Sequence, residues 1–123
     1  RCGWFDAVLV RQTCTISGVK GVALTKLDVL DGLDSVKICV GYKIGDKEFD
    51  YLPAASSQQS AVEPIYEVLE GWKEPTKSVR NFKKLPIECI NYVKRIEELV
   101  GCTICIISTG PEREDIIVLK DLF

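Results

Sequence analysis

The chain has 123 residues and a mass of 13.7 kDa, the size of one domain. Hydrophobic residues make up 46% of it and charged residues 28%, so it can bury a core, and intrinsic disorder is excluded. The 16 basic and 18 acidic residues give a formal charge of −2 without a long block of one sign. This balance disfavours nucleic acid as the main partner.

No apolar run approaches the ~18–20 residues that a membrane-spanning helix needs, and no secretory signal pattern opens the chain. We therefore expect a cytoplasmic protein without a membrane partner. Histidine is absent, which excludes Ser-His and Cys-His catalysis and removes the commonest zinc ligand. Methionine is absent too, and helical periodicity starts almost at the first residue, so we expect the cut end of a longer polypeptide.

The six cysteines would fit a disulfide scaffold in a secreted protein, but we expect reduced thiols in a reducing compartment. Cys39, Cys89, Cys102 and Cys105 all lie in apolar patterns, where a thiol behaves as a small buried hydrophobe. Cys102 and Cys105 have the spacing of a zinc or redox pair, yet residues three apart in a strand point to opposite faces. We predict no metal site from them.

In chain order, the first predicted elements are a helix and a buried strand. Apolar residues recur at helical spacing from Trp4 to Ser17, with Asp6 in the first turn and Gly18 as the end. Residues 19–24 form a short apolar run typical of a buried strand. The polar cluster Thr25-Lys26-Leu27-Asp28 therefore lies at the carboxyl end of a strand.

The middle of the chain predicts a hairpin and one further strand. Residues 36–43 alternate like a half-exposed strand, turn at Gly45-Asp46 and return along residues 48–52. Residues 63–69 alternate again. The segment 73–84 is rich in lysine and arginine, and both a solvated loop and a loop near a phosphate fit this composition.

The last part predicts a helix and two strands. The helix starts at Pro86 and ends at Gly101, residues 103–107 are typical of a strand buried on both faces, and residues 115–119 form a final strand. Strands that alternate with helices predict an α/β fold. We expect a fragment of a mainly parallel sheet with flanking helices and an antiparallel hairpin.

A Lys26-x-Asp28 pair just beyond a buried strand has the arrangement that recognises guanine in GTP-binding proteins. A carboxylate accepts hydrogen bonds from the ring N1–H and the exocyclic amine of guanine, whereas adenine presents an N1 lone pair that repels it. Two such bonds, worth roughly 1.5–3 kcal/mol each, separate the bases by several hundredfold or more. The Lys26 stem would lie along the base plane. Ordinary turn residues with an exposed ion pair fit the same spacing.

A second candidate is the loop Ser108-Thr109-Gly110-Pro111, which follows the last buried strand. Its backbone amides could meet a carbonyl oxygen of a base, and a simple turn fits the same residues. The chain contains no Gly-x-x-x-x-Gly-Lys-Ser/Thr phosphate loop. The phosphate-binding half of a nucleotide site is therefore missing from it.

Five segments carry a more specific pattern: residues 2–6 (Cys-Gly-Trp-Phe-Asp), 24–31 (Leu-Thr-Lys-Leu-Asp-Val-Leu-Asp), 63–67, 92–99 and 108–113. In their order and spacing they closely resemble the carboxyl-terminal part of the adenylosuccinate synthetase family. The resemblance implies that residues 1–123 are the carboxyl-terminal portion of such an enzyme, without the phosphate-binding and catalytic amino-terminal part. It also implies a parent fold similar to that of the P-loop NTPases.

The resemblance further implies a function for the complete protein. Enzymes of this family are homodimeric ligases that use GTP and Mg²⁺ to join IMP and L-aspartate into adenylosuccinate, on the way to AMP. Lys26 and Asp28 would belong to the guanine-recognition motif, and Ser108, Gly110 and Pro111 would line the same base pocket. The magnesium ligands and catalytic groups would lie outside this chain, so we expect the chain alone to be inactive.

Two points stay open at this stage. A stand-alone guanine-nucleotide-binding or interaction module without catalysis fits the same residues, and it would bind weakly for lack of phosphate contacts. In addition, after Gly71-Trp72 the family usually has a Glu-Ser-Thr-like run, where this chain has Lys73-Glu74-Pro75-Thr76. Pro75 restricts the backbone there and leaves the role of that loop open.

Overall fold

A computed structural model describes residues 4–18, 21–49, 62–76, 79, 81–110, 112 and 115–119. It confirms the predicted α/β class. The elements in chain order are β1 (Phe5–Asp6), α1 (Ala7–Ser17), β2 (Gly21–Leu24), the 3-10 helix η1 (Leu27–Leu30), β3 (Ser35–Ile44), β4 (Lys47–Phe49), β5 (Glu63–Glu70), the 3-10 helix η2 (Phe82–Lys84), α3 (Ile87–Val100), β6 (Thr103–Ser108) and β7 (Ile116–Val118).

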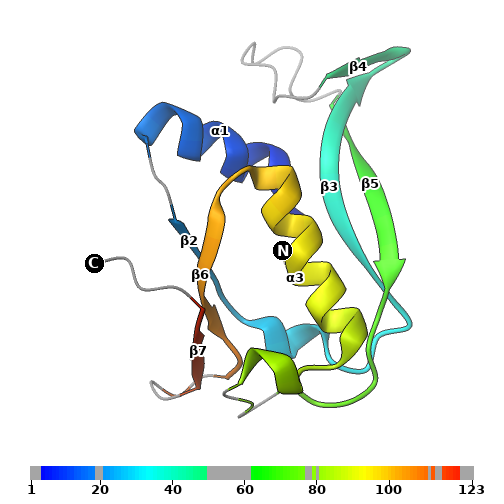
Figure 1. Ribbon diagram of the computed structural model, residues 1–123. Coiled ribbons are helices and arrows are strands. Elements are labelled where there is room, and N and C mark those ends of the chain that lie inside the picture. Colours follow the sequence, from blue (N-terminus) through cyan, green and yellow to red (C-terminus); the bar gives the residue numbers. More distant parts are fainter. Residues whose placement is uncertain are drawn as a thin grey trace.

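The strands form two sheets, and α3 runs between them (Figure 1). In the first sheet the long strand β3 pairs in parallel with β1 and antiparallel with β4 and β5. In the second sheet β2 pairs in parallel with β6, while β7 runs antiparallel along the other edge of β6. The predicted antiparallel hairpin is thus β3 with β4, and α3 lies on the crossover between the parallel strands β2 and β6.

The first helix begins at Ala7 rather than at Trp4, which corrects the sequence prediction. Residues 5–6 instead form the short strand β1 beside β3. Asp6 is the N-cap of α1, because its carboxylate accepts a hydrogen bond from the backbone N–H of Leu9 at 2.9 Å. The same carboxylate accepts a hydrogen bond from the hydroxyl of Tyr42 on β3. This tertiary contact keeps the backbone extended up to the cap.

Glycines end the two α-helices of the described residues, as the sequence predicted. Gly18 and Gly101 adopt the left-handed conformation with φ of 69° and 77°, and their backbone N–H groups bond back into the last helical turn. Pro86 precedes α3 as its N-cap, where its missing N–H leaves no hydrogen bond unmade. The carboxyl ends of α1 and α3 and the start of α3 are therefore set by local sequence.

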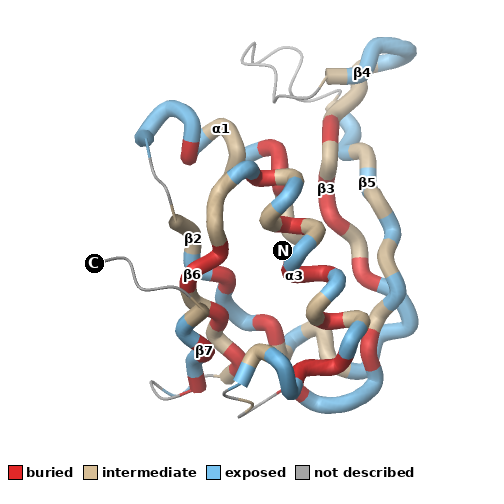
Figure 2. Tube along the Cα trace, in the orientation of Figure 1, coloured by how far each residue is buried: buried red, intermediate tan, exposed pale blue. Residues whose placement is uncertain are grey.

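One hydrophobic core fills the space between α3 and the two sheets, and Figure 2 shows buried residues on α3, β3 and β6. Burial of each large aliphatic side chain stabilises the fold by about 1.5–3 kcal/mol. Members that are at most 1% exposed come from several elements and include Leu27, Val36, Ile38, Trp72, Cys89, Ile96 and Ile107. The core therefore joins the sheets into one unit.

Two segments are less buried than the sequence predicted. In β2 only Leu24 is buried, since within the described residues β2 pairs along one edge, with β6. On α1, Leu9 and Ile16 belong to the predicted apolar stripe, but they are 48% and 84% exposed. Residues 19–20 and the end of the predicted hairpin, residues 50–52, lie outside the described part. No described helix has the length and apolar character needed to span a bilayer.

None of the described cysteines forms a disulfide: Cys14, Cys39, Cys89, Cys102 and Cys105. Burial, followed by the charge of Asp31, raises the pKa of Cys89 to about 12, so this thiol stays protonated and unreactive at neutral pH. Cys102 precedes β6 and is half-buried, while Cys105 within the strand is buried. These thiols pack in or against the core.

Candidate functional site

Two loops leave the second sheet side by side. In the parallel pair of β2 and β6, Leu24 lies opposite Ile107. Thr25 follows β2 and Ser108 is the last residue of β6, so the two strands end at the same edge of the sheet, at the lower end of the molecule in Figure 1. Open α/β sheets bind ligands at the carboxyl ends of parallel strands. The structure thus brings together the two segments that the sequence singled out.

Lys26 opens η1 with an unusual backbone. Its φ is 59°, which makes it the one non-glycine residue with a positive φ in the described ranges. Such strain costs about 1–2 kcal/mol in an L-residue and is typical of functional turns. The side chain is exposed and lines a hollow of about 330 Å³ together with Thr25. The other residues that line this hollow are mainly apolar: Trp4, Phe5, Leu24, Val29, Leu30 and Tyr92.

Asp28 is the second residue of η1 and is half-buried. Its backbone carbonyl accepts a hydrogen bond from the N–H of Asp31 at 3.1 Å. Its carboxylate has no hydrogen-bond or ion-pair partner among the residues that the structure describes. A carboxylate that is partly removed from water and has no partner among the described residues can accept hydrogen bonds from a ligand.

The exit loop of β6 is folded tightly. The Ser108 hydroxyl donates to the carbonyl of Gly110 at 3.1 Å, and the Thr109 N–H donates to the carbonyl of Asp115 at 2.8 Å. A Cβ atom at Gly110 would overlap the Asp115 carboxylate, so a larger residue there would have to displace that side chain. Pro111 lies outside the described residues. Asp28, Ser108 and Gly110 are not part of the wall of the hollow beside Lys26.

Comparison with known proteins places the chain in a family. A family model described as adenylosuccinate synthetase matches residues 1–117. The chain belongs to the adenylosuccinate synthetase family. A solved structure of fully ligated adenylosuccinate synthetase from Plasmodium falciparum is similar, with a TM-score of 0.89 and 34% sequence identity over 98% of this chain. The match covers 29% of that protein, so this chain spans under a third of its length.

These findings confirm the resemblance to the family that the sequence predicted. The loop that departs from the family pattern can now be located. Pro75 is exposed, whereas its neighbours Trp72 and Thr76 are 1% and 0% exposed. The residue that departs from the family pattern, Pro75, is therefore on the surface, while Trp72 and Thr76 hold the loop against the core.

Sequence reasoning missed Asp31 and its partners. The Asp31 carboxylate accepts hydrogen bonds from the indole N–H of Trp72 at 2.8 Å and from both the backbone N–H and the hydroxyl of Thr76 at 2.7 Å. Asp31-Gly32 carried a turn signal only. Thr76 lies in the segment 73–84, for which the sequence allowed a solvated loop or a loop near a phosphate. The structure shows that Thr76 is fully buried. No local pattern announces a contact of this kind.

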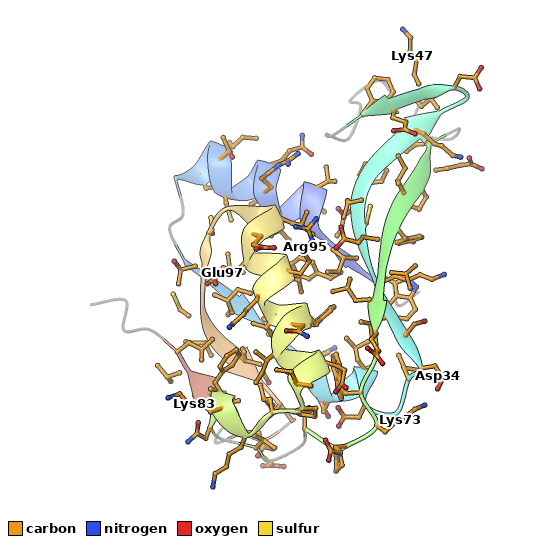
Figure 3. The ribbon with its side chains drawn as sticks, turned by 45° about the vertical axis from the view of Figure 1, so that its right-hand side comes forward. Asp34, Lys47, Lys73, Lys83, Arg95 and Glu97 are labelled. Atoms are coloured by element: carbon orange, nitrogen blue, oxygen red, sulfur yellow. The ribbon has the colours of Figure 1, made fainter. Side chains whose placement is uncertain are left out.

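The basic segment 73–84 is only partly described. Lys73 is exposed and donates to the carbonyl of Gly32 at 3.1 Å and to the carboxylate of Asp34, its neighbour in Figure 3. The hydrogen bond and the charge of Lys73 lower the pKa of Asp34. Lys83 and Lys84 are exposed in η2, while residues 77, 78 and 80 lie outside the description. Lys73 thus joins two turns of the chain.

Proposed function

We propose that this chain is the guanine-recognising, carboxyl-terminal portion of a GTP-dependent ligase that joins IMP and L-aspartate into adenylosuccinate. Family membership supports the reaction class. The observation that carries the recognition role is the Asp28 carboxylate, half-buried and without a partner in the described residues, at the carboxyl end of β2 beside the exit loop of β6.

Each group has a distinct task in this proposal. The Asp28 carboxylate accepts hydrogen bonds from N1–H and the 2-amine of guanine, and the aliphatic stem of Lys26 covers one face of the base. The Thr109 N–H is already bonded to Asp115, so we assign the Gly110 N–H to the 6-oxygen of guanine. Ser108 orders this loop through its bond to the Gly110 carbonyl. Pro111 completes the proposed set.

The remaining parts of the reaction are assigned to the enzyme outside this chain. The chain has no Gly-x-x-x-x-Gly-Lys-Ser/Thr sequence, so the phosphates of GTP, Mg²⁺, IMP and L-aspartate need groups from elsewhere in the complete protein. We therefore propose that the 123-residue polypeptide alone forms no adenylosuccinate. The complete enzyme is proposed to be a cytoplasmic homodimer, as the family resemblance implies.

The decisive test is Asp28→Asn in the complete synthetase. An asparagine amide keeps one acceptor and adds a donor, which clashes with the 2-amine of guanine but matches the 2-oxo group of xanthine. We expect the KM for GTP to rise about a hundredfold, since roughly 3 kcal/mol of charge-assisted bonding is lost. XTP should become the preferred nucleotide, while the KM for IMP changes less than about twofold.

Asp46→Asn is the matched control. Asp46 is exposed in the turn between β3 and β4, so the same chemical change there should leave all steady-state constants at their wild-type values. A variant at Asp28 that keeps both the GTP preference and the KM for GTP would contradict the proposed function.

A further inference from the structure

A path of hydrogen bonds joins the two loops of the proposed base site through a third segment. The path starts at Asp31, in the turn that follows η1, and ends at Thr109, in the exit loop of β6. Its middle consists of Thr76 and Val79, which lie between β5 and η2 in the sequence. None of these residues belongs to the set assigned to the base.

The first joint is the Asp31 carboxylate. It accepts hydrogen bonds from Trp72 and Thr76, whose side chains are almost completely removed from water, while the Asp31 N–H donates to the backbone carbonyl of Asp28. A carboxylate bonded to buried donors cannot leave them without stranding polar groups in the interior. The base-reading residue is therefore tied, through one neighbour, to the segment that contains Thr76.

The second joint is Thr109, which is 0% exposed. The carbonyl of Thr76 accepts a hydrogen bond from the Val79 N–H at 3.0 Å, and the Val79 carbonyl accepts one from the Thr109 hydroxyl at 3.2 Å. The same hydroxyl lies 3.3 Å from the Asp115 carbonyl. Thr109 stands between Ser108 and Gly110, so the segment that holds η1 also holds the exit loop of β6.

From this connection we infer that Asp31, Thr76 and Thr109 are positioning residues for nucleotide recognition. They hold the Lys26–Asp28 turn and the Ser108–Gly110 loop at the separation that guanine requires. A base read by hydrogen bonds from two loops needs both within about 0.5 Å of the productive geometry. Because both loops bond to the segment that contains Thr76 and Val79, neither can shift alone without breaking a hydrogen bond of this path. The inference rests on the proposed function.

The test uses Thr76→Val in the complete synthetase. Valine keeps the β-branched shape of threonine but removes the hydroxyl that donates to Asp31. We expect the KM for GTP to rise about ten- to a hundredfold, the range that displacement of a binding group by up to 1 Å produces. The preference for GTP over inosine triphosphate, which lacks the 2-amine, should shrink by a similar factor. The KM for IMP should change less than about twofold.

Three further variants make the result specific. Thr76→Ser retains the hydroxyl and should restore wild-type behaviour. Thr109→Val removes the hydroxyl that donates to the carbonyls of Val79 and Asp115, and it should reproduce the effect. It provides a second test if Thr76→Val does not fold. Thr13→Val removes a hydroxyl bond to the Leu9 carbonyl, 3.0 Å long, on an exposed turn of α1 and should change nothing.

The two possible failures are distinguishable. If Thr76→Val and Thr109→Val fold but match Thr76→Ser in the KM for GTP and in the preference for GTP, the positioning role is overturned. A fall in the yield of folded enzyme without a change in either quantity overturns it as well. If the wild-type enzyme does not prefer GTP over inosine triphosphate, or Asp28→Asn keeps that preference, the proposed function itself fails.

Discussion

Two carboxylates join distant parts of this chain in opposite surroundings. Asp31 ties the turn after η1 to Trp72 and Thr76, whose donors are buried. Glu67 on β5 accepts two hydrogen bonds from Arg95 on α3, at 2.6 and 2.8 Å, on a face where these side chains are 31% and 38% exposed (Figure 3 labels Arg95). The number of bonds is similar, but the donors to Asp31 are 1% and 0% exposed, so water competes more strongly for the second set. The comparison teaches that burial, rather than bond count, sets the cost of a change.

Gly71→Ala should disturb the region around Asp31, Trp72 and Thr76 more than Trp72→Phe. A Cβ atom at Gly71 would overlap the backbone carbonyl of Leu33, and neither backbone can move freely because the Gly71 N–H donates to the Asp34 carbonyl at 3.0 Å. We expect a loss of about 3 kcal/mol or more in the free energy of unfolding. Denaturant titration of the complete protein measures it.

Gly45→Ala is the control for this loss. Gly45 has a φ of 59° but open space around its Cβ position, so alanine there should cost about 1 kcal/mol. Equal losses for the two variants would show that the turns after η1 and β5 are not packed as described.

Trp72→Phe tests the buried joint with a smaller expected effect. Phenylalanine retains an aromatic ring against Tyr92, whose ring centroid lies 5.5 Å from that of Trp72, but it removes the N–H that donates to Asp31. We expect a loss of about 1–3 kcal/mol in the free energy of unfolding. Tyr66→Phe, on the exposed face of β5, should give about 0.5 kcal/mol or less. Thermal denaturation of the two variants measures both losses. A larger loss for Tyr66→Phe than for Trp72→Phe would contradict the buried hydrogen bond from Trp72 to Asp31.

Glu67→Gln tests the partly exposed carboxylate of the comparison and should have a smaller effect than Gly71→Ala or Trp72→Phe. The hydrogen bond to Arg95 is the main cause that lowers the pKa of Glu67 below its usual 4.5. A carboxyl group with a lowered folded-state pKa stabilises the fold above its unfolded-state pKa, and that stabilisation is lost as the pH falls through the folded-state value. We expect a difference of about 0.5–1 kcal/mol between wild type and variant at pH 7.

The pH dependence provides the check on this last variant. The difference between wild type and Glu67→Gln should shrink below about pH 4.5 and vanish at lower pH. Urea titrations at neutral and acidic pH measure it. A difference that stayed constant across this range would mean that the charge of Glu67 contributes nothing.

The sequence predicted the elements whose signals are local. The helix that ends at Gly101 and the strand at residues 103–107 were predicted correctly because periodicity and capping act over a few residues. The start of α1 was wrong because Asp6 bonds to Tyr42, a partner far along the chain. The burial of β2 was overestimated because an apolar sequence favours burial but does not specify which other elements pack against the strand.

The sequence by itself determined the α/β class, the glycine-terminated helices, the Lys26-x-Asp28 turn and, through five segments, the family. Only the tertiary structure decided that β2 and β6 end at the same edge of the sheet and that Asp31 meets Thr76. The physical reason lies in the range of the interactions. A cap or a stripe is complete within one or two turns, whereas the hydroxyl of Thr76 finds its acceptor 45 residues away, where no local pattern reaches.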